Sequence, residues 1–199
     1  MKYYLLAHGF ALTNDYWKHL VSQLDGKIYY FGDGTIDPNR AYIGIGHSLG
    51  FLKLNNAPFK FSHLIGLQGF LNFCGNRHAL RKVIEPKLDA IIQNFEADPT
   101  ETLKKFYQPY PYLTPAPEIL AKKTLLSELK MMKKSYPHCG VPTRVIGTRR
   151  DRVIPSAVIR DNFSRKEAIS MRILDLNIDH TLGWHSPEIV AHEIKRFTD

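Results

Sequence analysis

Short apolar runs alternate with stretches of helical spacing along this chain of 199 residues. Runs of four to eight apolar or β-branched residues that end at glycine, aspartate or asparagine are typical of buried strands. Six such runs occur, at 2–7, 27–31, 41–45, 63–67, 143–147 and 171–176. Apolar residues at helical spacing follow several of them and predict helices over 14–24, from 49 to 55, and from 187 to 197. The alternation of strands and helices predicts an α/β fold with a mostly parallel sheet flanked by helices.

The pattern changes between the fourth and fifth runs, over about 70–139. Prolines such as Pro86 interrupt the apolar spacing there, so we expect several short helices. Asp98, Pro99 and Glu101 combine a capping side chain, a proline at the first helical position and a glutamate at the third, which predicts a helix start. A second helix is predicted over 118–134. We therefore expect one domain, residues 1–199, with a helical cap inserted at about 70–139.

Composition limits the cellular environment and the binding partners that we expect for this chain. No apolar stretch approaches the roughly 20 residues that cross a bilayer, and the first residues lead directly into a strand, so we expect a cytoplasmic monomer without a membrane span. Cys74 and Cys139 lack the spacing of a zinc site or a disulfide framework. The net charge of +8 favours an acidic partner. No motif of a nucleic-acid-binding fold accompanies that charge, and the basic residues are dispersed, so nucleic acid is not an expected partner.

A candidate nucleophile follows the third apolar run, in the segment Gly46-His47-Ser48-Leu49-Gly50. In the Gly-x-Ser-x-Gly pattern the serine sits on a sharp turn from strand to helix, and the glycines avoid collisions with neighbouring backbone. The five residues alone are weak evidence, because small residues cluster in many ordinary turns. Their position between a strand and a helix points to Ser48 as a nucleophile.

A serine nucleophile needs a base and a carboxylate that orients the base. Asp151 follows the fifth run, and we assign it as the acid. Its structural alternative is a loop residue paired with a neighbouring arginine. The competing carboxylates are Asp33, Asp37, Asp161, Asp175 and Asp179. Asp33 precedes the serine in the chain, and Asp161 falls in an expected helix.

Three histidines near the end of the chain compete for the role of base. His180 follows the sixth run directly and is our assignment, because open α/β sheets place their sites at the carboxyl ends of strands. His185 precedes the expected helix cap at Ser186, and His192 lies inside the last helix. His47 and His8 have ordinary structural explanations. His47 is expected to pack beside the serine, and His8 is a strand-end residue.

The negative oxygen of an acyl-transfer intermediate needs backbone N–H donors. The residue after the serine and one from an early loop usually supply them, which points to Leu49 and Phe10. Gly9 alone indicates no more than a tight turn. Together, Ser48, Asp151, His180, Phe10 and Leu49 predict acyl transfer to water with no metal or organic cofactor.

The chain resembles the α/β-hydrolases over nearly its whole length, and within them the carboxylesterases of biotin synthesis, which cleave the methyl ester of pimeloyl-acyl carrier protein. Three segments carry the resemblance to these esterases: 6–12 with Trp17, 141–155 and 179–188. It implies a minimal α/β-hydrolase fold, with Ser48, Asp151 and His180 as nucleophile, acid and base. Phe10 stands where those enzymes have tryptophan, and Phe51 where glycine is frequent.

In those esterases a helical cap binds the acidic carrier protein through basic residues. Residues 100–139 hold seven lysines and three glutamates, and Lys104, Lys105, Lys122 and Lys123 are our candidates for carrier contact. Exposed lysines more commonly only solvate a helix surface. Two further readings stay open: a generalist short-acyl esterase or thioesterase, and a binding module of hydrolase fold without catalysis.

Overall fold

Each of the six apolar runs forms a strand in the computed structural model, which describes residues 1–113, 118–164 and 167–199. The strands are β1 (Lys2–Ala7), β2 (Gly26–Tyr30), β3 (Ala41–His47), β4 (Lys60–Leu67), β5 (Thr143–Thr148) and β6 (Ile169–Leu174). They lie in the order β2-β1-β3-β4-β5-β6, and every neighbouring pair is parallel. The predicted parallel α/β architecture is confirmed.

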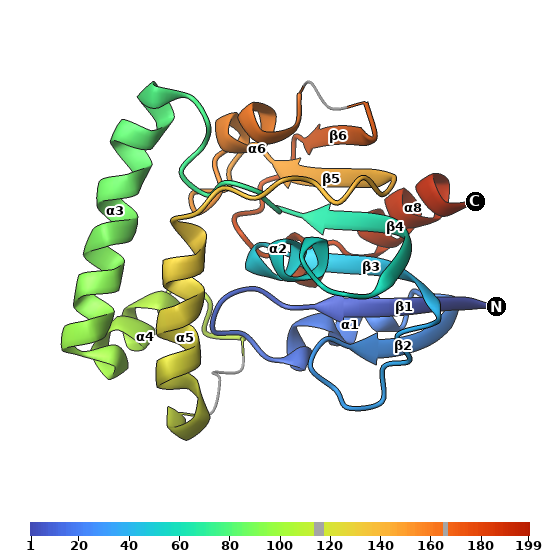
Figure 1. Ribbon diagram of the computed structural model, residues 1–199, viewed down its shortest axis with the longest axis horizontal. Helices are drawn as coiled ribbons and strands as arrows, with labels where there is room; N and C mark the ends of the chain where they lie inside the picture. The colour runs from blue at the N-terminus through green and yellow to red at the C-terminus, as the bar shows by residue number, and fades with distance from the viewer. Residues whose placement is uncertain (114–117, 165–166) are drawn as a thin grey trace.

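Helices cover both faces of this sheet (Figure 1). On one face, alternate strand residues such as Leu5 and Leu64 pack with α2 and α6; on the other, Leu6 and Ile65 pack with α1 and α8. Burial on both faces explains why the strands read as continuous apolar runs. The helices are η1 (Asn14–Trp17), α1 (Lys18–Val21), α2 (Leu49–Asn55), α3 (His78–Ala97), α4 (Pro99–Tyr107), α5 (Glu118–Met132), α6 (Ser156–Phe163), α7 (Leu182–His185) and α8 (Pro187–Thr198).

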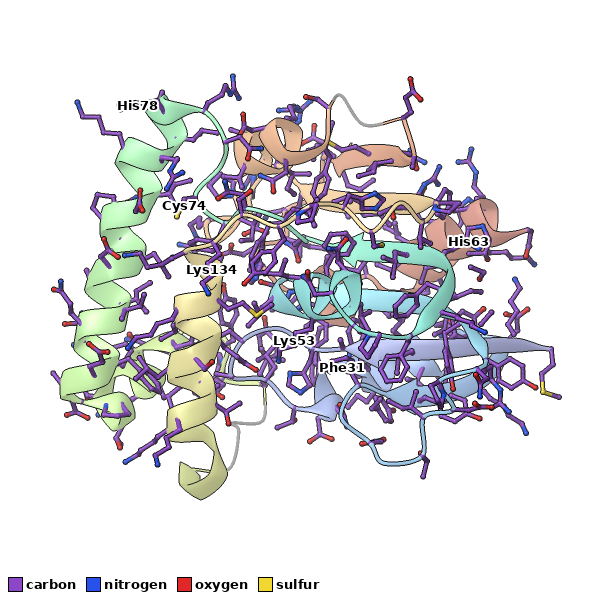
Figure 2. The ribbon with its side chains drawn as sticks, in the orientation of Figure 1. Phe31, Lys53, His63, Cys74, His78 and Lys134 are labelled. Carbon is purple, nitrogen blue, oxygen red and sulfur yellow. The ribbon has the colours of Figure 1, made fainter. Side chains whose placement is uncertain are left out.

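Helices α3, α4 and α5 stand beyond the carboxyl ends of the strands, between β4 and β5 in the chain (Figure 1). Figure 2 shows Cys74 on the connection from β4 to α3, His78 at the start of α3 and Lys134 just past α5. Side-chain ion pairs link α5 to its neighbours: Lys53–Glu128 at 2.5 Å, Lys130–Glu96 at 2.7 Å and Lys133–Asp89 at 2.6 Å. Residues 114–117 of the expected insertion lie outside the described residues.

Two helix predictions need correction. Pro86 does not interrupt a helix but lies inside α3, which continues over 20 residues. The residue is exposed, so the carbonyl that loses its N–H partner stays within reach of water. The helix expected over 14–24 is a 3₁₀ turn followed by one α-helical turn that ends at Val21, and this shorter path already buries Trp17 and Leu20. The predicted cap at Asp98 is present, because its side chain accepts the Glu101 N–H at 2.9 Å.

No helix within the described ranges combines the length and the apolar character that crossing a membrane requires.

Candidate active site

Ser48 occupies a strained turn between β3 and α2. Its φ of 53° and ψ of −121° lie in a region that non-glycine residues rarely adopt. The glycines on either side are sterically required. A Cβ on Gly46 would lie 2.3 Å from the Phe51 Cα, and one on Gly50 would lie 1.9 Å from the Ala7 carbonyl oxygen. The turn therefore has the geometry of a nucleophile elbow, with Ser48 at the carboxyl edge of a central strand.

The predicted backbone donors lie beside this turn. Leu49 is the first residue of α2, and the N–H groups of a first helical turn have no acceptor within their own helix. Gly9 packs against Ser48, since a Cβ on Gly9 would lie 3.2 Å from the Ser48 Cβ. Phe10 follows Gly9 and lines the same cavity as Ser48. Both predicted donors thus come from segments that adjoin the serine.

Asp151 lies on the loop after β5 and is 4% exposed. Its Oδ1 accepts the N–H groups of Val153 and Ile154 at 2.9 and 2.8 Å. The arginines around it bind elsewhere: Arg149 pairs with Asp175, Arg150 donates to Asn177, and Arg152 pairs with Asp179. The structural alternative for Asp151, an ion pair with a neighbouring arginine, does not match these contacts.

His180 lies on the loop after β6, and its Nδ1 donates to Asp151 Oδ2 at 2.9 Å. The His180 ring is buried, and it lines the same cavity as Ser48. The two competing histidines lie elsewhere. His192 is exposed on α8, and the exposed His185 bonds through Nε2 to the Tyr112 hydroxyl at 2.8 Å. The three candidate catalytic residues therefore follow the ends of three strands: Ser48 and His180 line one cavity, and Asp151 reaches it through its bond to His180.

His47 and Gln68, to which the sequence assigns no catalytic role, contact the hydrogen-bonded pair Asp151–His180. The Nε2 of His47 donates to the His180 carbonyl at 2.9 Å, and its ring stacks on Tyr16. Burial, reinforced by the neighbouring His180, lowers the pKa of His47 well below its usual value. Gln68 donates from Nε2 to Asp151 Oδ2 at 2.7 Å. Its one sequence signal is position, directly after the apolar run that becomes β4.

The cavity in front of Ser48 has a volume of about 300 Å³. Its walls are mainly apolar, and they come from the loop after β1 and from the helices α3, α4 and α5. Representative lining residues are Phe10, Leu88, Phe106, Leu129 and Met132. Two cationic side chains, Lys87 and Arg152, also line it. Such a cavity suits an apolar chain whose reacting group lies at Ser48.

The four candidate carrier-binding lysines lie on exposed surfaces of α4 and α5. Lys104 and Lys105 lie 4.0 and 3.7 Å from the carboxylate of Glu101 in their own helix. Lys122 and Lys123 are exposed on α5. The cavity residues do not include any of the four.

No protein-family model matches this sequence, and no curated protein does. Solved structures match nearly the whole chain in fold. An esterase from Exiguobacterium antarcticum has a TM-score of 0.70 at 14% identity, with 99% of this chain and 91% of that chain covered. A lipase-esterase related protein from Clostridium acetobutylicum gives 0.65 at 16% identity, covering 98% and 94%. An epoxide hydrolase mutant from Bacillus megaterium gives 0.66 at 14%, covering 99% and 93%. The chain therefore has the α/β-hydrolase fold.

Proposed function

We propose that this protein is a serine carboxylesterase that hydrolyses an acyl ester through an acyl-enzyme. One observation carries the proposal: the strained Ser48 and His180 line one mainly apolar cavity, and His180 is hydrogen-bonded to the buried Asp151. A nucleophile, a base and an orienting acid in this relation are the requirements of acyl transfer. That two of the fold neighbours are named as an esterase and a lipase-esterase related protein is consistent with it.

In the proposed reaction, the Ser48 hydroxyl attacks the ester carbonyl while the His180 Nε2 takes its proton. Asp151 accepts the Nδ1–H and so fixes the tautomer that leaves Nε2 free. The N–H groups of Phe10 and Leu49 bind the negative oxygen of the tetrahedral intermediate. His180 returns the proton to the leaving alcohol, and water activated by the same histidine then releases the acid from Ser48.

The substrate we propose is the methyl ester of pimeloyl-acyl carrier protein, in biotin synthesis. The apolar cavity supports an aliphatic acyl chain. The net charge of +8 and the exposed lysines of α4 and α5 support an acidic macromolecular partner. On this proposal Lys104, Lys105, Lys122 and Lys123 contact the carrier while the chain enters the cavity.

A second candidate is a generalist short-acyl esterase or thioesterase. The ion pairs of Lys104 and Lys105 with Glu101 favour it, because they offset part of the charge that would attract a carrier. The same three catalytic residues would cleave an ester or a thioester. A non-catalytic binding module would use the cavity without turnover.

The test is to incubate the purified protein, with Ser48→Ala as control, with methyl pimeloyl-acyl carrier protein and to follow the intact conjugate by mass spectrometry. Loss of one methyl group with the thioester preserved supports the proposed substrate, and release of the pimeloyl group identifies a thioesterase. An unchanged conjugate together with hydrolysis of a small chromogenic ester supports the generalist. If neither substrate turns over, the esterase proposal is wrong.

A further inference from the structure

Gln68 has a backbone conformation that few other residues of this structure adopt. Its φ is 52°, and among the described residues the other non-glycine positions with positive φ are Ala11 and Ser48. Ser48 and Gln68 directly follow β3 and β4, and Ala11 lies on the loop after β1. Such backbone angles are unfavourable for residues other than glycine and persist only where surrounding contacts enforce them. The turn at Gln68 is thus enforced beside the catalytic groups.

The side chain of Gln68 is completely buried and fully bonded. Its Nε2 donates to Asp151 Oδ2 and to the Asp179 carbonyl, both at 2.7 Å. Its Oε1 accepts the Leu182 N–H at 3.1 Å. These partners fix the orientation of the amide, because a carboxylate and a carbonyl only accept and a backbone N–H only donates.

These bonds join the acid to the loop that carries the base. Asp151 Oδ2, the oxygen that accepts from Gln68, also accepts from His180 Nδ1. Asp179 and Leu182 flank His180 in the sequence, one on each side. The Gln68 amide therefore bonds to the Asp151 carboxylate through one hydrogen. Its other two bonds hold Asp179 and Leu182, on either side of His180.

We infer that Gln68 is a positioning residue, whose amide sets the rotation of the Asp151 carboxylate and its distance from His180. The consequence for catalysis rests on the proposed esterase function. Without the Gln68 amide, Asp151 Oδ2 has one partner instead of two, and the 179–182 segment loses two of its anchors. The imidazole is then held less firmly, and a misplacement of about 1 Å is enough to cost on the order of 100-fold in rate.

The test compares substitutions at Gln68 with the same kind of change at another buried amide. Asn55, 6% exposed at the end of α2, donates from Nδ2 to the Pro137 carbonyl at 2.9 Å and accepts the Cys139 N–H at 3.1 Å. Gln68→Met and Asn55→Leu remove the bonds but keep much of the volume. Gln68→Glu and Asn55→Asp keep the shape and the acceptor, but they replace each donor by an acceptor.

For hydrolysis of a small chromogenic ester, Gln68→Met should lower kcat by roughly 100-fold with little change in KM. Gln68→Glu should be slower still, because its carboxylate faces the Asp151 carboxylate and the Asp179 carbonyl. The Asn55 variants should lower the melting temperature comparably and leave kcat unchanged. A Gln68→Met variant whose kcat equals that of the wild type would overturn the inference.

A readout that needs no substrate separates this inference from the esterase proposal. The proton on His180 Nδ1 gives a low-field NMR signal in protein labelled with ¹⁵N-histidine, and its absence from His180→Ala assigns it. Gln68→Met should shift or broaden this signal, and Asn55→Leu should not. If the wild type hydrolyses no ester but the signal responds, the esterase proposal is wrong and the positioning role holds. If the signal and kcat are both unchanged in Gln68→Met, the positioning role is wrong.

Discussion

The two walls of the cavity are built differently. On the sheet side, Ser48, Asp151 and His180 are each at most 6% exposed, and buried hydrogen bonds hold Asp151 and His180. On the helical side, α3 leaves Val83 57% exposed and Ile91 40% exposed, and the ion pairs that link α3 to α5 lie at the surface. Exposed pairs of this kind contribute about 0–1 kcal/mol each.

This difference assigns separate tasks to the two walls. A buried network in which each donor has an acceptor tolerates little displacement, which suits groups that must meet a reacting atom in a fixed geometry. The helical wall is held partly by surface ion pairs between α3 and α5, so we expect a change of its cavity-lining side chains to disturb that geometry less. Substitutions on the sheet side should therefore change the rate of chemistry, and those on the helical side should change which substrate is accepted.

The largest expected effect in this comparison is on the sheet side. Asp151→Asn should lower kcat by about 10⁴-fold with KM nearly unchanged, because an amide facing Nδ1 favours the wrong imidazole tautomer. Initial rates on a small ester over a range of concentrations measure both constants. A loss confined to KM would contradict the role of Asp151 as the orienting acid.

On the helical side, Ile84→Trp should narrow the cavity from α3. Ile84 lines the cavity, so esters of long acyl chains should lose roughly 10- to 100-fold in kcat/KM while acetyl esters keep theirs. A series of 4-nitrophenyl esters of increasing chain length measures the profile. Val83→Trp is the matched control, since Val83 is the exposed neighbour and should leave the profile unchanged. An equal loss for all chain lengths in Ile84→Trp would indicate damage to the chemistry rather than to the acyl site.

A smaller effect is expected from charge on the helical side. The combined variant Lys104→Glu, Lys105→Glu, Lys122→Glu and Lys123→Glu should lower kcat/KM for a carrier-linked ester by about tenfold and spare a small ester, because surface charge acts mainly on association. Added salt should reduce the wild-type rate on the carrier-linked ester. The control is Lys27→Glu with Lys60→Glu, which reverses the charge of two exposed lysines at the start of β2 and β4, away from α4 and α5. Unchanged turnover of the carrier-linked ester would remove these lysines from the proposed contact.

The smallest effect concerns stability on the sheet side. Because burial lowers the pKa of His47, this imidazole binds a proton below about pH 6.5 in the unfolded chain but stays neutral in the folded chain. The contribution of His47 to the free energy of unfolding is therefore complete above about pH 6.5, and it falls by up to about 1.4 kcal/mol per pH unit below it. Urea unfolding from pH 7 to 5 measures this slope. His47→Gln, which keeps a donor for the His180 carbonyl, should reduce the slope, and His192→Gln on the exposed face of α8 should not.

Much of this arrangement follows from local patterns in the sequence. The six strands, the elbow at Ser48 and the loop positions of Asp151 and His180 depend on neighbours within a few residues, such as the glycines at 46 and 50. Chain order then places Asp151 and His180 on loops after consecutive strands, and parallel pairing brings those loops to one edge of the sheet.

The sequence could not supply what depends on distant contacts. Gln68 lies 83 residues from Asp151 and 114 from Leu182, and nothing near it in the chain shows that its amide would meet both. The effect of Pro86 on α3 depends on distant contacts for a related reason. Its cost to a helix is local, but the exposure that makes α3 tolerate it is set by packing on the rest of the molecule.

The helical wall begins and ends at one point of the sheet domain. The Tyr136 N–H donates to the Leu71 carbonyl at 3.1 Å, so the chain that leaves for α3 and the chain that returns from α5 are joined at their base. Everything between these two residues forms a closed loop that contributes no strand within the described ranges. For protein engineering, Leu71 and Tyr136 mark graft points: exchanging the helical segment between them for one of another length or charge would test whether the proposed active site then accepts other substrates.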